Sequence, residues 1–194
     1  MITTQQNLQN HLNDGSITQE EYNEYYPYDG MEGSYYSVFV ETDLTDNGVK
    51  YEITEHKAVF NMEELGDVEL PYPEWDAKNL FVRDDKKSNY YLITVRGEKR
   101  VNLKEFGKRN GLRKLSFASP EDLMSFMGLT PGSVTPLGLL NDKESRVRFF
   151  LDAEFTGHKI GVHPNDNTAT VWLESDDLIR LIQAHGNEVS VTEI

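Results

Sequence analysis

The stretch that contributes most to the predicted fold is residues 78–95, which read Lys-Asn-Leu-Phe-Val-Arg-Asp-Asp-Lys-Lys-Ser-Asn-Tyr-Tyr-Leu-Ile-Thr-Val. Residues 79–83 and 90–95 are apolar or β-branched runs, and residues 84–89 between them are polar. Two such runs around a short polar turn are typical of a β-hairpin. The sequence therefore predicts a hairpin over residues 79–95.

Further elements are predicted on both sides of this hairpin. Additional strands are expected over residues 49–54, 114–117, 146–151 and 169–173, and a short helix over residues 62–65. Capping residues mark the starts of three longer helices at Asn102, Ser119 and Ser175. Glycines at 111, 128 and 186 mark their ends. Mixed strands with interspersed short helices predict an α+β domain over residues 31–194.

The N-terminal segment differs in composition from the rest of the chain. Residues 1–30 are polar, acidic and rich in tyrosine, so we predict an N-terminal extension outside the domain. The segment lacks the basic start and apolar stretch of a secretory signal, and no apolar run approaches the length of about 20 residues that spans a bilayer. We expect a cytoplasmic protein that does not enter a membrane.

Charge and composition exclude several classes of function. The chain has 33 acidic and 19 basic residues, a net charge of −14, which argues against a broad nucleic-acid-binding face. The absence of cysteine excludes thiolate zinc sites and a cysteine nucleophile.

The positive charge is unevenly placed, and two interpretations of it remain open. Residues 1–49 contain no Lys or Arg. Residues 78–114 carry Lys78, Arg83, Lys86, Lys87, Arg96, Lys99, Arg100, Lys104, Lys108, Arg109, Arg113 and Lys114. This segment is either a solvated hairpin and helix or a surface that orients the molecule toward a polyanion.

The first candidate site segment is Lys78-Asn79 at the start of the hairpin. A lysine in that place is either a solvated strand end or a cation held at a rigid sheet edge, where it meets a phosphate or carboxylate.

The second candidate segment covers residues 129–138, in which two prolines and two glycines bracket Ser133, Val134 and Thr135. Proline fixes φ and removes a backbone donor, while glycine permits close backbone approach. Such a loop is either an ordinary connection or a set of N–H groups presented to a carbonyl or a developing oxyanion. The candidate residues are Gly132, Ser133, Val134, Thr135 and Pro136.

The third candidate segment, residues 163–168, packs an imidazole, two amides, a carboxylate and a hydroxyl into six residues. His163 and Asn167 are its candidate site residues. His158 and His163 lie five residues apart, which matches no standard zinc spacing. We therefore predict neither a metal site nor a cofactor.

These segments together carry a resemblance to a known family. The motifs, in order, are His56-Lys-Ala-Val-Phe60, Lys78-Asn-Leu-Phe-Val-Arg-Asp84, Leu115-Ser-Phe-Ala-Ser-Pro120, Gly128-Leu-Thr-Pro-Gly-Ser-Val-Thr-Pro136, Leu140-Asn-Asp142 and His163-Pro-Asn-Asp-Asn-Thr168. Over roughly residues 45–190 the chain resembles the YbaK/prolyl-tRNA-synthetase-associated domain family. The nearest branch comprises free-standing proteins similar to the editing insertion of bacterial prolyl-tRNA synthetase.

The resemblance implies a fold, a reaction and site residues. The implied fold is a curved, barrel-like mixed β-sheet with flanking short helices. The implied reaction is hydrolysis of the ester between a mischarged amino acid and the 3′ end of tRNA, with Ala-tRNA(Pro) as the expected substrate and prolyl-tRNA synthetase as a possible partner. By motif, Lys78, Gly132 and His163 take catalytic roles. Asn79, residues 133–136 and Asn167 bind the substrate.

Two further expectations complete the prediction. The loops at 132–136 and 163–168 are expected to form opposite walls of one small pocket. The alternatives are an editor of another aminoacyl-tRNA, such as Cys-tRNA(Pro), or a non-catalytic module that binds a synthetase or tRNA through the acidic N-terminal extension.

Overall fold

The computed structural model describes residues 44–56, 70–165 and 168–194. The predicted extension over residues 1–30, the predicted helix over residues 62–65 and the candidate Asn167 lie outside the described residues.

The predicted hairpin is present and lies within a five-stranded sheet. It consists of β2 (Ala77–Asp84) and β3 (Tyr90–Arg96), which are antiparallel with Asn79 opposite Thr94. Asp84 holds the turn, since its carboxylate accepts hydrogen bonds from Lys86 N, Ser88 N and Asn89 Nδ2 at 3.1, 2.9 and 2.6 Å. The strand order is β4-β2-β3-β5-β8. The added strands are β4 (Leu115–Phe117), β5 (Val147–Asp152) and β8 (Val189–Thr192). Pairing is parallel in β3-β5-β8 and antiparallel elsewhere, so the sheet is mixed.

A second, smaller sheet has the order β1-β7-β6 and is antiparallel throughout. Its strands are β1 (Tyr51–Glu55), β6 (Lys159–Val162) and β7 (Ala169–Glu174). One isolated bridge, from Asp76 to Gly161, connects it to the larger sheet. The α+β class is confirmed, but the strands form two sheets joined at this bridge and do not close into a barrel.

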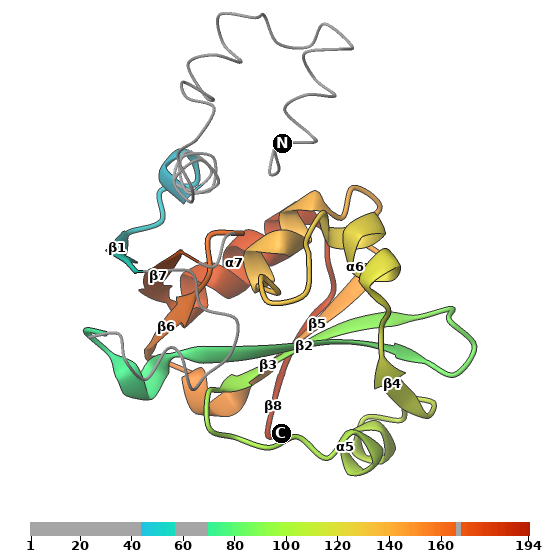
Figure 1. The fold of residues 1–194 in the computed structure, drawn as a ribbon. Helices are drawn as coiled ribbons and strands as arrows, with labels where there is room; N and C mark the ends of the chain where they lie inside the picture. Colours follow the sequence, from blue (N-terminus) through green and yellow to red (C-terminus); the bar gives the residue numbers. More distant parts are fainter. Residues whose placement is uncertain (1–43, 57–69, 166–167) are drawn as a thin grey trace, which may run out of the picture.

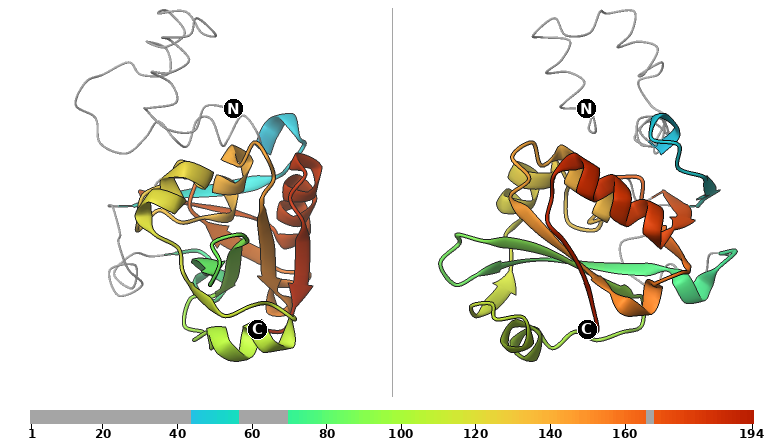
Figure 2. Two further views of the ribbon diagram at one scale, coloured as in Figure 1. Left: turned by 90° about the vertical axis from the view of Figure 1, so that its right-hand side faces the viewer. Right: turned by 180° about the vertical axis from the view of Figure 1, so that it is seen from behind.

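Helices cover both faces of the larger sheet (Figure 1, Figure 2). α6 (Pro120–Met127), α7 (Ser175–His185) and the 3₁₀ helix η2 (Pro136–Asn141) lie on one face, and α5 (Leu103–Arg109) lies on the other. Two short 3₁₀ helices, η1 (Pro73–Trp75) and η3 (Ala153–Phe155), connect the strands.

Alternation along β2 divides the core between the two faces. Phe81 packs in the cluster under α6, η2 and α7, whereas Val82 packs in the cluster that contains Phe106 of α5. Successive side chains of a strand point to opposite faces. Neighbouring residues of β2 therefore serve two different environments.

Two of the three predicted N-caps are formed. The prediction for Ser175 is wrong, because Ser175 is the first residue of α7 and its hydroxyl donates to the carbonyl of Phe155, while Glu174 is the N-cap and forms no side-chain capping hydrogen bond. Asn102 accepts hydrogen bonds from Lys104 N and Glu105 N at 3.2 Å, and Ser119 forms a capping box with Asp122. Gly128 and Gly186 end α6 and α7 with positive φ angles of 64° and 114°. These local signals explain why the helix positions agree with the prediction.

Candidate functional site

Asn79 connects the hairpin to the second candidate loop. Thr94 Oγ1 of β3 donates to Asn79 Oδ1 at 2.6 Å, and Asn79 Nδ2 donates to the carbonyl of Val134 at 3.0 Å. Thr94 is fully buried, so its hydroxyl fixes the orientation of the Asn79 amide. The predicted substrate-binding residues Asn79 and Val134 thus lie in direct contact.

Thr135 connects this loop to the third candidate segment. Its buried hydroxyl donates to the carbonyl of His163 at 2.7 Å and accepts from Leu137 N at 3.4 Å at the start of η2. One hydroxyl can donate one hydrogen bond and accept others, so both contacts form together. The loops at 132–136 and 163–168 therefore meet at this hydrogen bond.

A pocket of about 240 Å³ opens beside this loop. Asn79, Gly132 and Val134 line it, and the remaining lining residues are Leu80, Phe81, Phe117, Ala118, Ser119, Pro120, Leu123 and Pro131. His163 is not among them. β4 and the start of α6 supply the other wall of this pocket, and the arrangement of the two loops as opposite walls of one site stays a prediction.

The loop that lines the pocket has amides available for a ligand. Ser133 N donates to Thr130 O at 3.1 Å, which forms a turn. Within the described part of the chain, the N–H groups of Gly132 and Val134 take part in none of the loop, turn and side-chain hydrogen bonds. Gly132 has a φ of 98°, a conformation that side-chain-bearing residues rarely adopt.

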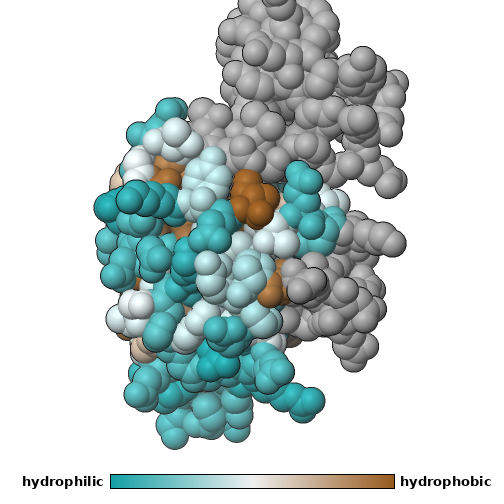
Figure 3. Space-filling model, turned by 90° about the vertical axis from the view of Figure 1, so that its left-hand side faces the viewer, coloured by the Kyte–Doolittle hydropathy of each residue, from teal (hydrophilic) through white to brown (hydrophobic). Residues whose placement is uncertain are grey.

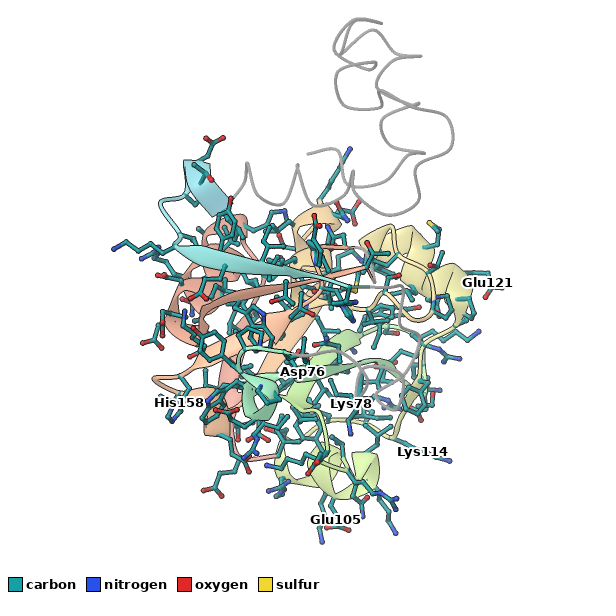
Figure 4. The ribbon with its side chains drawn as sticks, turned by 60° about the vertical axis from the view of Figure 1, so that its left-hand side comes forward. Asp76, Lys78, Glu105, Lys114, Glu121 and His158 are labelled. Carbon is teal, nitrogen blue, oxygen red and sulfur yellow. The ribbon has the colours of Figure 1, made fainter. Side chains whose placement is uncertain are left out.

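Lys78 points away from this loop. It precedes Asn79 in β2, so their side chains leave opposite faces of the strand. Its amine donates to the carbonyl of Lys99, and burial, together with the nearby Arg100, lowers the pKa of the Lys78 amine. Figure 4 shows Lys78 and Asp76 at the start of β2. The two residues of the Lys78-Asn79 motif are therefore separated by the strand itself.

Two histidines lie side by side at the ends of the smaller sheet. The rings of His56 and His163 have centroids 6.2 Å apart in an edge-to-face arrangement. His163 Nδ1 lies 3.0 Å from the carbonyl of Ala169, and His56 Nε2 lies 3.1 Å from Thr170 Oγ1. A carbonyl only accepts, so His163 Nδ1 donates, and Nε2 of the neutral ring is an acceptor.

Asn165 is a buried polar residue in the loop after β6. It is 5% exposed, it has a φ of 65°, and its Oδ1 and Nδ2 have no hydrogen-bond partner in the described part of the chain. Asparagine tolerates this φ better than most residues. A buried amide without partners costs free energy, and a bound ligand can supply the missing partners.

Metal ligation is not indicated among the residues that the structure describes. They contain no group of three or more His, Asp or Glu side chains placed to hold a metal ion.

Comparison with known proteins assigns the family. A family model described as the aminoacyl-tRNA editing domain matches residues 56–181. The chain belongs to the aminoacyl-tRNA editing domain family. The resemblance inferred from the sequence is thereby confirmed, and this editing domain is an aminoacyl-tRNA deacylase.

Curated relatives cover most of the editing domain. The "Prolyl-tRNA editing protein ProX" of Acetoanaerobium sticklandii is 36% identical over 152 residues, which cover 78% of this chain and 93% of that protein. "Prolyl-tRNA synthetase associated domain-containing protein 1" of Mus musculus is 34% identical over 167 residues, which cover 81% of this chain and 96% of that protein.

Solved structures support the fold of the editing domain. A crystal structure described as a candidate trans-editing enzyme for prolyl tRNA synthetase has a TM-score of 0.61 at 21% identity, covering 82% of this chain and 98% of that one.

In residues 44–56, 70–165 and 168–194, every helix is too short or too polar to span a bilayer.

Two polar residues of the editing domain received no role from the sequence. His56 opens the first matched motif, but a lone histidine indicates no function by itself. Asn165 stands between His163 and Asn167, and only its burial and positive φ distinguish it from a loop residue. Its place in a polar His-Pro segment is the one sequence signal that points to Asn165.

Proposed function

We propose that this editing domain acts in trans on mischarged tRNA(Pro) and hydrolyses Ala-tRNA(Pro) in preference to other esters. The observation that carries the proposal is the pocket of about 240 Å³, lined by Gly132 and Val134, whose amides are available to a ligand. The names of the relatives support tRNA(Pro) as the RNA, because both refer to prolyl-tRNA or its synthetase.

The size of the pocket supports alanine as the preferred amino acid. Pockets for drug-sized ligands measure about 300–1,000 Å³, so this one suits a smaller group. A synthetase pocket made for proline rejects a smaller amino acid by only about 1–3 kcal/mol per methylene-sized difference, and a second, smaller site is therefore needed. The proposal requires that this second site exclude proline by its shape.

The reaction requires little beyond positioning and charge stabilisation. Water attacks the ester carbonyl, the bond from the carbonyl carbon to the ribose oxygen breaks, and the proton lost by water passes to that oxygen. Amides of Gly132 and Val134 stabilise the oxyanion that forms on the carbonyl, and one such donor typically contributes about 2.7–4 kcal/mol. An aminoacyl ester is already activated, so a protein nucleophile is not needed.

The histidine side of the site binds the terminal ribose and the attacking water. His163 Nε2 is oriented as an acceptor by the hydrogen bond from Nδ1 to Ala169 O. Asn165 supplies an amide from the same loop, and Asn167 has the same proposed role. Lys78 approaches the terminal phosphate or the polar groups of the substrate, which requires its amine to leave the carbonyl of Lys99.

The partners follow from the proposed reaction. The tRNA acceptor end is the substrate, and prolyl-tRNA synthetase is a proposed partner because it produces the mischarged ester. Both act where aminoacyl-tRNA is made, and we place this editing domain in the cytoplasm.

Deacylation of tRNA(Pro) charged with alanine, cysteine, serine or proline tests the proposal. We expect the purified full chain to release alanine fastest and to leave Pro-tRNA(Pro) at its spontaneous rate. Faster release of cysteine would assign the cysteine-specific alternative. No release from any of the four, by a folded protein that still binds tRNA, would leave a non-catalytic module.

A further inference from the structure

An aromatic side chain lies uncovered at the edge of the pocket. Phe117 of β4 is 63% exposed, more than Met124 at 47% or Val191 at 43%, the other exposed large apolar residues of the described chain. Phe117 also lines the pocket that Asn79 and Gly132 line. An exposed aromatic ring at the rim of a binding pocket is a candidate contact for a ligand.

The sheet register explains why Phe117 is not covered. Phe117 is opposite Val82, and Leu115 is opposite Asp84. Val82 and Leu115 pack with Phe106 of α5, but Phe117 is not part of that cluster. The cover provided by α5 thus reaches Val82 and Leu115 but does not include Phe117, whose ring is left in solvent.

Unpaired cations gather on the neighbouring helix. Lys104, Lys108 and Arg109 of α5 and Lys114 beside β4 are exposed, and none of them forms an ion pair within the described residues. Other cations of the same segment are neutralised, since Arg113 pairs with Asp85 and Lys99 with Asp152 and Glu154. Lys104, Lys108, Arg109 and Lys114 are called the α5 cation group below.

The α5 cation group lies beside Phe117 and away from the acidic side of the pocket. α5 packs against β4. Figure 3 shows a hydrophilic lower end of the molecule, the end that carries α5 in Figure 1. Figure 4 places Lys114 at the lower right and Glu105 of α5 at the bottom, with Glu121, at the start of α6, above Lys114. A polyanion at the rim of the pocket would therefore be attracted toward α5.

We infer that Phe117 stacks on a base of the unpaired 3′ end of the tRNA and that the α5 cation group binds the phosphates that lead to the acceptor stem. This inference rests on the proposed function, which places the aminoacyl ester in the adjacent pocket. Unpaired bases stack on exposed aromatic rings with little dependence on sequence. Cations held near such a ring bind the backbone.

Substitution of Phe117 tests the stacking contact. We expect Phe117→Ala and Phe117→Leu to raise the Kd for an uncharged acceptor-stem RNA hairpin with a single-stranded 3′ end about tenfold, equal to about 1.4 kcal/mol. KM for Ala-tRNA(Pro) should rise by the same factor while kcat stays within about twofold. Phe117→Trp should bind within about threefold of the unchanged protein. Met124→Ala is the control, because Met124 is exposed on α6 outside this pocket.

Charge reversal tests the phosphate contacts. Lys108→Glu and Lys114→Glu should weaken hairpin binding and reduce the salt dependence of log Kd, by about 0.7–0.9 for each phosphate that is no longer neutralised. Lys143→Glu is the control, because it makes the same charge change near the C-terminal end of α6. It should leave the Kd for the hairpin within about twofold of the unchanged protein. Normal hairpin binding by the Phe117 and α5 variants overturns the inference even if the editing reaction is found. Because hairpin binding is measured without hydrolysis, absence of deacylation alone would contradict only the proposed function.

Discussion

Thr135→Val removes the hydrogen bond between the two candidate loops and leaves the volume of the side chain nearly unchanged. Valine replaces the hydroxyl with a methyl group, so the core is not opened, but the carbonyl of His163 loses its 2.7 Å donor and Leu137 N loses its cap. An unsatisfied, partly buried carbonyl costs about 1–3 kcal/mol. The 3.4 Å cap adds an amount toward the low end of the roughly 0.5–2 kcal/mol that is typical of helix caps.

We therefore expect Thr135→Val to lower the free energy of unfolding by about 2 kcal/mol. For a chain of this length that equals a decrease in Tm of about 4–8 °C. Activity should fall further than stability explains, because the loop that carries the Gly132 and Val134 amides loses its attachment to the His163 segment. We expect kcat/KM for Ala-tRNA(Pro) to fall at least about tenfold, roughly 1.4 kcal/mol of transition-state stabilisation.

Thr135→Ser is the matched control, measured at a temperature well below both values of Tm. Serine keeps the hydroxyl and loses one buried methyl group, worth about 0.8 kcal/mol. It should lower Tm by a few degrees and keep kcat/KM within about twofold. The reasoning is refuted if the valine variant keeps normal activity, or if the serine variant loses as much activity as the valine variant.

Three further predictions concern the site and its surroundings. Burial raises the pKa of Asp76 to about 7 from its ordinary value of 3.8, so the folded state keeps a proton that the unfolded state releases. The free energy of unfolding should therefore fall as pH rises from about 4 to 7. Asp76→Asn should remove this pH dependence and raise the free energy of unfolding at pH 8 by up to about 4 kcal/mol, measured by urea titration. The same pH dependence in both proteins would contradict this. Asn165→Gly keeps the φ of 65° and removes the unpaired amide. The free energy of unfolding should change by less than about 1 kcal/mol, while the deacylation rate falls about fivefold or more. Unchanged kinetics would exclude a role of Asn165 in binding. Gly132→Val is strained at a φ of 98° and narrows the pocket. We expect the deacylation rate to fall at least about tenfold, and thermal unfolding should show a loss of stability of about 1–3 kcal/mol. A stable and fully active variant would place the ester elsewhere.

Local signals in the sequence are sufficient to predict most helices and strands. The capping residues Asn102 and Ser119 and the polar turn at 84–89 act over a few residues, and each corresponds to an observed cap or turn. The sequence analysis does not predict β6 and β8, which have four residues each. Pro136 and Gly138 suggest a loop where η2 forms, whereas the apolar residues of η2 fill the core.

The candidate site depends on pairing that the sequence does not display. β1 and β6 both pair with β7, with Thr54 opposite Thr170 and Val162 opposite Val171. This shared partner brings His56 next to His163, although they are far apart along the chain. The pocket wall from β4 and α6 has the same origin, since the register of β4 on β2 decides where Phe117 lies.

The hydrogen bonds that assemble the site join residues far apart along the chain. Asn79 and Val134 are separated by 55 positions, Thr135 and His163 by 28, and His56 and Thr170 by 114. Contacts of such high sequence separation form late and slowly in folding, because each must first overcome the entropy of closing a long loop. We therefore expect a partly folded chain to lack the proposed ester-binding pocket and to hydrolyse no aminoacyl-tRNA. The rate of deacylation should consequently be proportional to the amount of natively folded protein. A fragment that lacks one of the two sheets should have no deacylation activity.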